Sequence, residues 1–128
     1  MSLEKIPVEL LLSIEGACSL SLECWRLGRI AEQSQDDVER AGLRHVVRRI
    51  SETLKEMAIE AIDFAGRSYD PGMVPDVVEV IECNGSPEGI IVDETIAPTV
   101  TWRGQVIKSG QIIVKRTLAP SQETPKAT

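Results

Sequence analysis

The stretch FAGRSYDPGM, residues 64–73, separates two parts of the chain that have different sequence periodicities. Apolar side chains before it recur every three or four residues, which is typical of a helix, whereas the residues after it have the pattern of short strands. Gly66 suits the left-handed conformation that often ends a helix, and Pro71 favours an extended Asp70. The sequence therefore predicts a helix that ends at Gly66 and a β unit that begins beyond it.

The strongest periodic signal lies directly before this stretch. Apolar side chains follow one another at alternating steps of four and three residues: Leu43, Val47, Ile50, Leu54, Met57, Ala61 and Phe64. This spacing is a heptad repeat, the pattern of helices that pack along their length. We expect one helix over about residues 37–65, opened by Ser34 and Asp37 as a variant of the capping box. Such a helix would be roughly 43 Å long.

We expect an earlier helix over residues 7–32, with Pro7 in its first turn, where the missing N–H costs nothing. Its apolar surface is wide, because two neighbouring stripes run along it. The stripes consist of Leu11, Ile14, Cys18, Leu22 and Trp25, and of Leu10, Ala17, Leu20, Cys24 and Leu27.

A hairpin of these two helices cannot bury so wide an apolar surface by itself. Either the β unit folds back over it, or a second copy docks and completes a four-helix bundle. We favour the homodimer, because the heptad spacing is typical of packing between helices. The side chains expected at the dimer interface are Leu11, Ile14, Cys18, Leu43, Val47, Ile50, Leu54 and Met57.

The period changes to that of strands from Val77 onward, and tight turns containing glycine separate the short apolar runs. The sequence therefore predicts an α+β fold. A helical hairpin over residues 1–66 forms the dimeric four-helix bundle, and a small, mostly antiparallel β domain follows over residues 67–116. Residues 117–128 are polar and contain proline, so we expect them to be disordered.

The charge distribution argues against a nucleic-acid partner. The formal net charge is −6, with 8 basic and 12 acidic side chains in residues 1–66 and 6 and 8 in residues 67–128. Binding to a phosphate backbone depends on clustered lysine and arginine. The nearest approach to such a cluster, Arg40, Arg44, Arg48 and Arg49, is interrupted by acidic residues and is interpreted as a solvated helix face.

Cysteine usage and hydropathy indicate a cytoplasmic protein. Cys18, Cys24 and Cys83 are too few and too scattered for a disulfide framework, and their spacing fits no zinc site. The apolar run over residues 8–14 is too short to cross a membrane and lacks the features of a signal peptide. We therefore expect reduced thiols, no bound metal and no membrane partner.

Familiar catalytic motifs are absent from the sequence, among them the nucleophile elbow, the Walker loop and the zinc-protease helix. The single histidine, His45, lies within the heptad region and is interpreted as a surface or bundle residue. We therefore expect a protein that acts by contact, not an enzyme, and no cofactor.

The order of these motifs resembles the GrpE family of nucleotide exchange factors, which act on DnaK-type chaperones. VELLLSIEGACSL (residues 8–20) and SETLKEMAIEAIDFAG (51–66) are similar to the bundle helices of that family. YDPGM (69–73) resembles its entry to the β domain. SPEGIIVDETI (86–96) and RGQVIKSGQIIVK (103–115) resemble its later strands. The family's long N-terminal helix has no counterpart here, so the resemblance is to a short or divergent form.

The resemblance implies a homodimeric cochaperone for protein folding under stress, which binds the nucleotide-binding domain of a DnaK-type chaperone and promotes ADP release. We expect the contact patch to contain Met73, Trp102, Arg103 and Val106, because interface centres favour aromatic, arginine and methionine side chains. The alternative for Trp102 is a place in the core of the β domain. The chain departs from the family at Val74, where histidine usually stands, and along residues 105–110. The alternative function is therefore a dimeric adaptor with a GrpE-like fold that has lost exchange activity.

Overall fold

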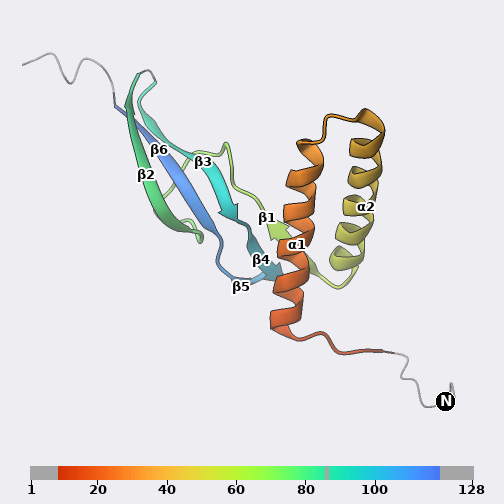
Figure 1. Cartoon of the computed structure of the whole chain (residues 1–128). Coiled ribbons are helices and arrows are strands. Elements are labelled where there is room, and N and C mark those ends of the chain that lie inside the picture. Colours follow the sequence, from red (N-terminus) through yellow and green to blue (C-terminus); the bar gives the residue numbers. More distant parts are fainter. Residues whose placement is uncertain (1–8, 86, 119–128) are drawn as a thin grey trace, which may run out of the picture.

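A computed structural model describes residues 9–85 and 87–118 of the chain. Two helices precede six strands within these residues (Figure 1). Helices α1 (Ile14–Glu32) and α2 (Asp37–Glu56) pack as a hairpin, and the strands form two three-stranded sheets. The expected α+β fold, with a helical hairpin followed by a β unit, is therefore confirmed.

Helix α1 starts later than the sequence predicts. The described residues before Ser13 are not helical, and the Ser13 side chain caps the helix by accepting a hydrogen bond from the Gly16 N–H at 2.9 Å. Serine is among the residues that best satisfy the free N–H groups of a first turn. The expected start at residue 7 is therefore wrong for residues 9–13, and Pro7 itself lies outside the described residues.

Helix α2 also begins at a different cap from the expected one. The Asp36 carboxylate accepts hydrogen bonds from the N–H groups of Val38 and Glu39, at 2.9 and 3.3 Å. Ser34, the expected cap, instead donates to the Glu39 carboxylate at 3.0 Å. The loop between the helices is therefore closed by Asp36 as N-cap and Ser34 as a side-chain bridge.

The predicted continuation of α2 to residue 65 is wrong. The helix ends at Glu56, and Ala58 has a positive φ of 63°, which turns the chain out of the helical path. The next residues form strand β1 (Ile59–Ile62), in which Ile59 lies opposite Trp102 and Ile62 opposite Thr99. The pairing of β1 with a distant strand overrides the helical spacing of its apolar side chains, because β-branched isoleucine suits a strand at least as well.

The first sheet joins the helical hairpin to the rest of the chain. Its strand order is β1-β4-β5, with β4 (Thr99–Trp102) antiparallel to both neighbours and β5 (Gln105–Lys108) at one edge. Strand β1 lies before the expected boundary at residue 66 and β4 lies after it, so this sheet draws on both of the expected modules.

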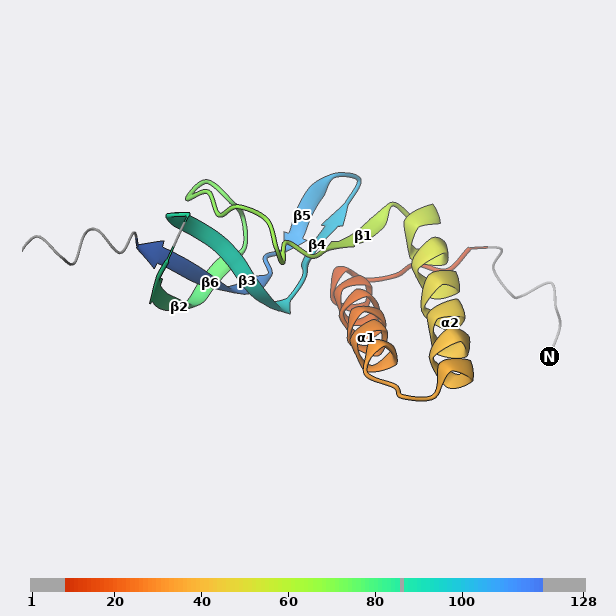
Figure 2. The same ribbon diagram turned by 90° about the horizontal axis from the view of Figure 1, so that it is seen from above.

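The second sheet has the strand order β2-β6-β3. Strand β2 (Asp76–Asn84) runs parallel to β6 (Gln111–Leu118), whereas β3 (Gly89–Ala97) runs antiparallel to it. The two sheets are connected directly, because only the buried Pro98 separates β3 from β4. Figure 2 shows the first sheet between the hairpin and the second sheet.

Two separate cores follow from this arrangement. The first packs the helices on the first sheet and consists of Ala17, Cys24, Leu54, Ile59 and Val100, with Cys18, Val47 and Ile107 at its margin. The second lies on one face of the second sheet and consists of Val92, Ile112 and Val114, with Phe64, Tyr69, Met73 and Val77 at its margin. The chain therefore buries apolar area at both ends of the β unit.

The stretch 64–73 covers the second core and does not end a helix. Gly66 does adopt a left-handed conformation, with φ at 86°, but its N–H donates to the carbonyl of Val92 at 2.8 Å. Met73 N–H donates to the Asp70 carbonyl at 2.8 Å, which closes a tight turn around Pro71. The expected break between helix and strands is therefore displaced, and this stretch is a covering loop.

The chain remains ordered in a strand slightly beyond the expected end of the β domain. Thr117 and Leu118 pair with Cys83 and Asn84 of β2. The expectation of disorder from residue 117 is therefore wrong for these two residues. The remainder of that expectation, residues 119–128, lies outside the described residues.

Gly110 is expected to be the least replaceable glycine of the fold. A Cβ at this position would lie 2.5 Å from the Ala97 carbonyl oxygen and 2.7 Å from the Thr99 nitrogen, both backbone atoms. Gly110→Ala must therefore displace the connection between the two sheets. We expect a loss of about 2 kcal/mol or more in the free energy of unfolding, measured by urea denaturation.

Gly42→Ala provides the matched control, since a Cβ there meets no atom within 4 Å and the residue lies inside α2. It is expected to leave stability unchanged or to raise it by up to about 1 kcal/mol. Equal stabilities for the two variants would contradict the close approach at Gly110.

Candidate interaction surfaces

An exposed apolar stripe runs along the helical hairpin. Val46, Ile50 and Met57 lie on one side of α2 or at its C-cap, and between 36% and 46% of each side chain is exposed. Their spacing of four and seven residues places them on one helix face. Leu20 of α1 joins them, because it lines a shallow groove of about 260 Å³ together with Ile50 and Met57. We call these four residues the hairpin stripe.

The structure divides the eight side chains expected at a dimer interface into two groups. Leu54 is buried inside the hairpin, and Cys18, Leu43 and Val47 are half-buried. Exposed members of the set are Leu11, Ile14, Ile50 and Met57. Leu11 also lies outside α1, so its expected place in an apolar stripe of the first helix is wrong. Part of the heptad pattern therefore serves packing within one chain, and part of it faces outward.

The turn between β4 and β5 carries two of the four residues expected to contact a partner. The Arg103 guanidinium lies over the Trp102 ring, 4.5 Å from its centroid, and Trp102 is 39% exposed. Arg103 has a positive φ of 52°, and its N–H donates to the Ala58 carbonyl at 2.9 Å. This hydrogen bond fixes the turn against the end of the helical hairpin. Trp102 is therefore partly buried and partly exposed, which lies between the two expected placements in a contact patch and in the core of the β domain.

Val106 and Met73 do not join this pair. Val106 lies opposite Thr101 across β4 and β5, and Trp102 is the next residue along β4. Successive side chains of a strand point to opposite faces, so Val106 and Trp102 lie on different faces of the sheet. Met73 packs against the core of the second sheet. The four residues do not form a single patch.

Trp102 also lines an apolar groove next to the N-terminal end of α1. The groove has a volume of about 410 Å³. Its other lining residues are Leu10, Leu11, Leu12, Ser13, Ile14, Ala17, Met57, Ile59 and Ile107. Met57 belongs to this groove and to the hairpin stripe, so apolar surface extends from the helices to the β4–β5 turn.

A polar network centred on Asp63 joins α1 to the segment after β1 and to the second sheet. The Asp63 carboxylate accepts hydrogen bonds from Trp25 Nε1 at 3.0 Å, from Thr95 Oγ1 at 2.6 Å and from the Ala65 N–H at 2.9 Å. Arg29 donates to the Thr95 carbonyl at 2.9 Å and lies over the Trp25 ring at 4.9 Å. These five residues belong to α1, the segment after β1, and β3. The network therefore fixes the second sheet relative to the helical hairpin.

The surroundings of Asp63 lower the pKa of its carboxyl group. Partial burial by itself raises this pKa, but the hydrogen bonds from Thr95, Ala65 and Trp25 and the charge of Arg29 together outweigh that effect. The network was not predicted from the sequence, because its partners are far apart along the chain and no spacing rule links Asp63 to Thr95.

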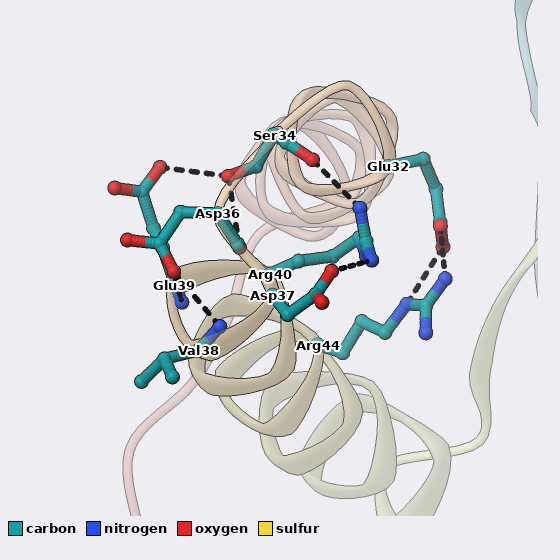
Figure 3. A network of polar contacts seen from close by, with 8 residues as sticks. All are labelled: Glu32, Ser34, Asp36, Asp37, Val38, Glu39, Arg40 and Arg44. Atoms are coloured by element: carbon teal, nitrogen blue, oxygen red, sulfur yellow. Dashed lines mark hydrogen bonds and ion pairs between the residues drawn. The ribbon is translucent and has the colours of Figure 1, made fainter.

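A second polar network closes the far end of the hairpin (Figure 3). Arg44 forms a two-pronged ion pair with Glu32, which lowers the pKa of the Glu32 carboxyl and raises that of Arg44 through their hydrogen bonds. Arg40 donates to the Ser34 carbonyl at 2.8 Å and pairs with Asp37. Two of the four arginines in the expected solvated stripe are therefore held by partners within the chain.

The described residues contain no group of three or more histidine, cysteine, aspartate or glutamate side chains arranged to hold a metal ion. Cys18, Cys24 and Cys83 are free thiols. None of the helices in the described part is long and apolar enough to cross a membrane. His45 is exposed on α2.

Comparison with known proteins does not identify the chain. No protein-family model and no curated protein sequence matches it.

Asp63→Asn is expected to loosen the joint between the hairpin and the second sheet. The amide removes the charge and one acceptor, so the buried Thr95 hydroxyl or the Trp25 N–H loses its partner. We expect a loss of about 1–2 kcal/mol in the free energy of unfolding. Asp93→Asn, on an exposed residue of β3, is the control and should change stability by less than about 0.5 kcal/mol.

The pH dependence of this stabilisation follows from the lowered pKa. The Asp63 contribution is complete above the pKa of the unfolded chain, about 3.9, and is lost as pH falls through the lower folded value. The stability difference between the native chain and Asp63→Asn is therefore expected to be constant near neutral pH. It should shrink below about pH 4. A difference that grew with acidification would contradict the assignment.

Proposed function

We propose that the chain forms a homodimer through its helical hairpins and acts as a GrpE-like cochaperone. In this role it binds the nucleotide-binding domain of a DnaK-type chaperone and promotes ADP release. The observation that carries the proposal is a helical hairpin with an exposed apolar stripe, followed in sequence by two small sheets. That order of elements is the one the sequence resemblance implies.

The proposed dimer is supported by the position of the hairpin stripe. Leu20, Val46, Ile50 and Met57 lie on the helices and remain open to water in the single chain. Covering them with a second hairpin removes apolar surface from water, which is favourable by about 25 cal/mol for each Å² buried. The half-buried and buried members of the heptad already hold the two helices together, so each hairpin can offer a preformed surface.

Exchange activity needs no catalytic group in this proposal. A cochaperone that binds the open nucleotide cleft more tightly than the closed one shifts the chaperone toward the open state, and ADP then dissociates. The β unit would supply the contact through the β4–β5 turn, where Trp102 and Arg103 stack at the surface. The Asp63 network holds the second sheet in a fixed position relative to the hairpin, which supports a rigid contact surface.

The second candidate is a dimeric adaptor with the same fold and a different partner. It is favoured by the separation of Met73 and Val106 from the Trp102–Arg103 pair, because the four residues expected to form one contact patch lie on different surfaces. Both candidate functions require the dimer, but only the first requires a DnaK-type chaperone as the partner.

Ile50→Glu is expected to dissociate the dimer. A carboxylate in the centre of the hairpin stripe would have to be desolvated on pairing, whereas in the free chain it remains in water. Sedimentation equilibrium should give about twice the 14.0 kDa chain mass for the native protein and the chain mass for the variant. His45→Glu adds the same charge at an exposed position of α2 and should leave the dimer intact. A monomeric native protein would remove this part of the proposal.

The exchange proposal is tested by mixing the native protein with a DnaK-type chaperone preloaded with fluorescent ADP. Release should accelerate with increasing protein, and Arg103→Glu should reduce the acceleration while the sedimentation mass is unchanged. An unaltered release rate at saturating native protein, with the dimer present, would favour the adaptor.

A further inference from the structure

The two outer edges of the second sheet differ in whether another segment of the chain covers them. The outer edge of β3 is covered, because residues 66–69 bond to it: Gly66 N–H donates to the Val92 carbonyl, Val92 N–H to the Arg67 carbonyl and Tyr69 N–H to the Ile90 carbonyl, all at 2.8 or 2.9 Å. Strand β2 forms the opposite edge, and in the described residues its backbone bonds run inward to β6 and the residues next to it. The outer edge of β2 is therefore open (Figure 1).

The open edge is long enough to accept another strand. A register shift at Val77 and Glu79 places an irregularity near the start of β2, and regular pairing continues from Glu79 to Asn84. The side chains along it remain in water, with Val80 50% exposed and Ile81 39% exposed. Native edges are commonly blunted by charged side chains, bulges, proline or a covering segment. Strand β2 has the irregularity at its start and the carboxylates of Glu79 and Glu82, but its regular part contains no lysine or proline.

Charge decides which kind of strand fits. Residues 68–102 contain no lysine or arginine but seven acidic residues: Asp70, Asp76, Glu79, Glu82, Glu88, Asp93 and Glu94. The inner neighbour β6 contributes Lys115 and Arg116, which lie opposite Ile81 and Glu82. Pairing of β2 with the β2 of a second copy would bring acidic strands together, which is unfavourable for like charges on neighbouring strands. A cationic segment gains the opposite interaction.

The positions of the carboxylates define the pattern of the partner. Glu79 and Glu82 are three residues apart and so project from opposite faces of the sheet. Glu82 also pairs with Arg116 of β6 at 3.9 Å, and because both side chains are more than half exposed, this ion pair is weak. Val80 and Ile81 lie between them, one on each face. A matching strand therefore carries two cations three residues apart, with two β-branched apolar residues between them. Because this pattern reads the same in both directions, it fits in a parallel or an antiparallel orientation.

We propose that the outer edge of β2, over Glu79–Asn84, is a docking site for an extended protein segment of the pattern cation-apolar-apolar-cation, which adds to the second sheet as a fourth strand. Backbone hydrogen bonds supply the attachment and the flanking charges select the sequence, as in other cases of strand addition. This inference does not depend on exchange activity, and it concerns a surface apart from the hairpin stripe and the β4–β5 turn.

The test uses the native protein and the fluorescein-labelled peptide Thr-Lys-Val-Val-Lys-Thr, with binding followed by fluorescence anisotropy and by amide shifts in NMR spectra. We expect binding that weakens with salt, with shifts concentrated in residues 79–84. The peptide Thr-Glu-Val-Val-Glu-Thr should not bind. Glu79→Lys should weaken binding by about fivefold or more, whereas Glu60→Lys, the same charge change on exposed residue 60 of the first sheet, should not.

Two further peptides separate strand addition from charge attraction alone. Each is N-methylated at alternate residues, one at the odd and the other at the even positions. A strand presents alternate N–H groups to its neighbour, so one peptide should lose binding and the other should retain it. Equal binding of the two would overturn the proposal.

Sedimentation distinguishes a peptide site from an interface between copies. Glu79→Lys should leave the mass of the native protein unchanged, and a change in mass would show that β2 pairs with itself and would also overturn the proposal. Because ADP release is not measured in this experiment, its outcome and that of the exchange assay are independent.

Discussion

The pairing of β1 with β4 is the constraint on which the rest of the structure depends. It begins immediately after α2, where Ala58 turns out of the helical path and Ile59 meets Trp102 across the sheet. Ile59 and Val100 then pack against the helices in the first core. Without this pairing, the helical hairpin would have no sheet to pack against, and the segment after β1 could not bring Asp63 to Trp25 and Thr95.

The elements that the sequence predicts well are those with many locally consistent signals. The helical hairpin and the change to strands are visible because helix and strand periods differ along long stretches. The end of α2 is missed because Ala61 and Phe64 continue the heptad spacing by coincidence, while Ile59 and Ile62 pair with a strand forty residues later. Gly66 has the backbone conformation expected of it, but in a loop over the second sheet.

The interaction surfaces were harder to predict than the fold. Helical spacing identifies apolar positions, yet it does not say which of them face the neighbouring helix and which face water. Leu54 and Ile50 are four residues apart, and one is buried while the other is exposed. The Asp63 network depends on contacts between residues far apart in the sequence, and the open edge of β2 depends on the strand order of the whole sheet. Neither can therefore be predicted from a local sequence pattern. The Asp63 network fixes the second sheet relative to the helical hairpin, and the open edge of β2 leaves one side of that sheet available for binding.

The strand order also governs the sequence of events in folding. The two helices are joined by a short loop and can form as soon as residue 56 is available, whereas β2 must wait for β6, because Asp76 pairs with Gln111. Distant pairings of this kind are slow to form. During synthesis on the ribosome, β2 therefore leaves the tunnel with both of its edges unpaired. The carboxylates of Asp76, Glu79 and Glu82 lie along this strand, and charges in such positions oppose the association of exposed strands from different chains.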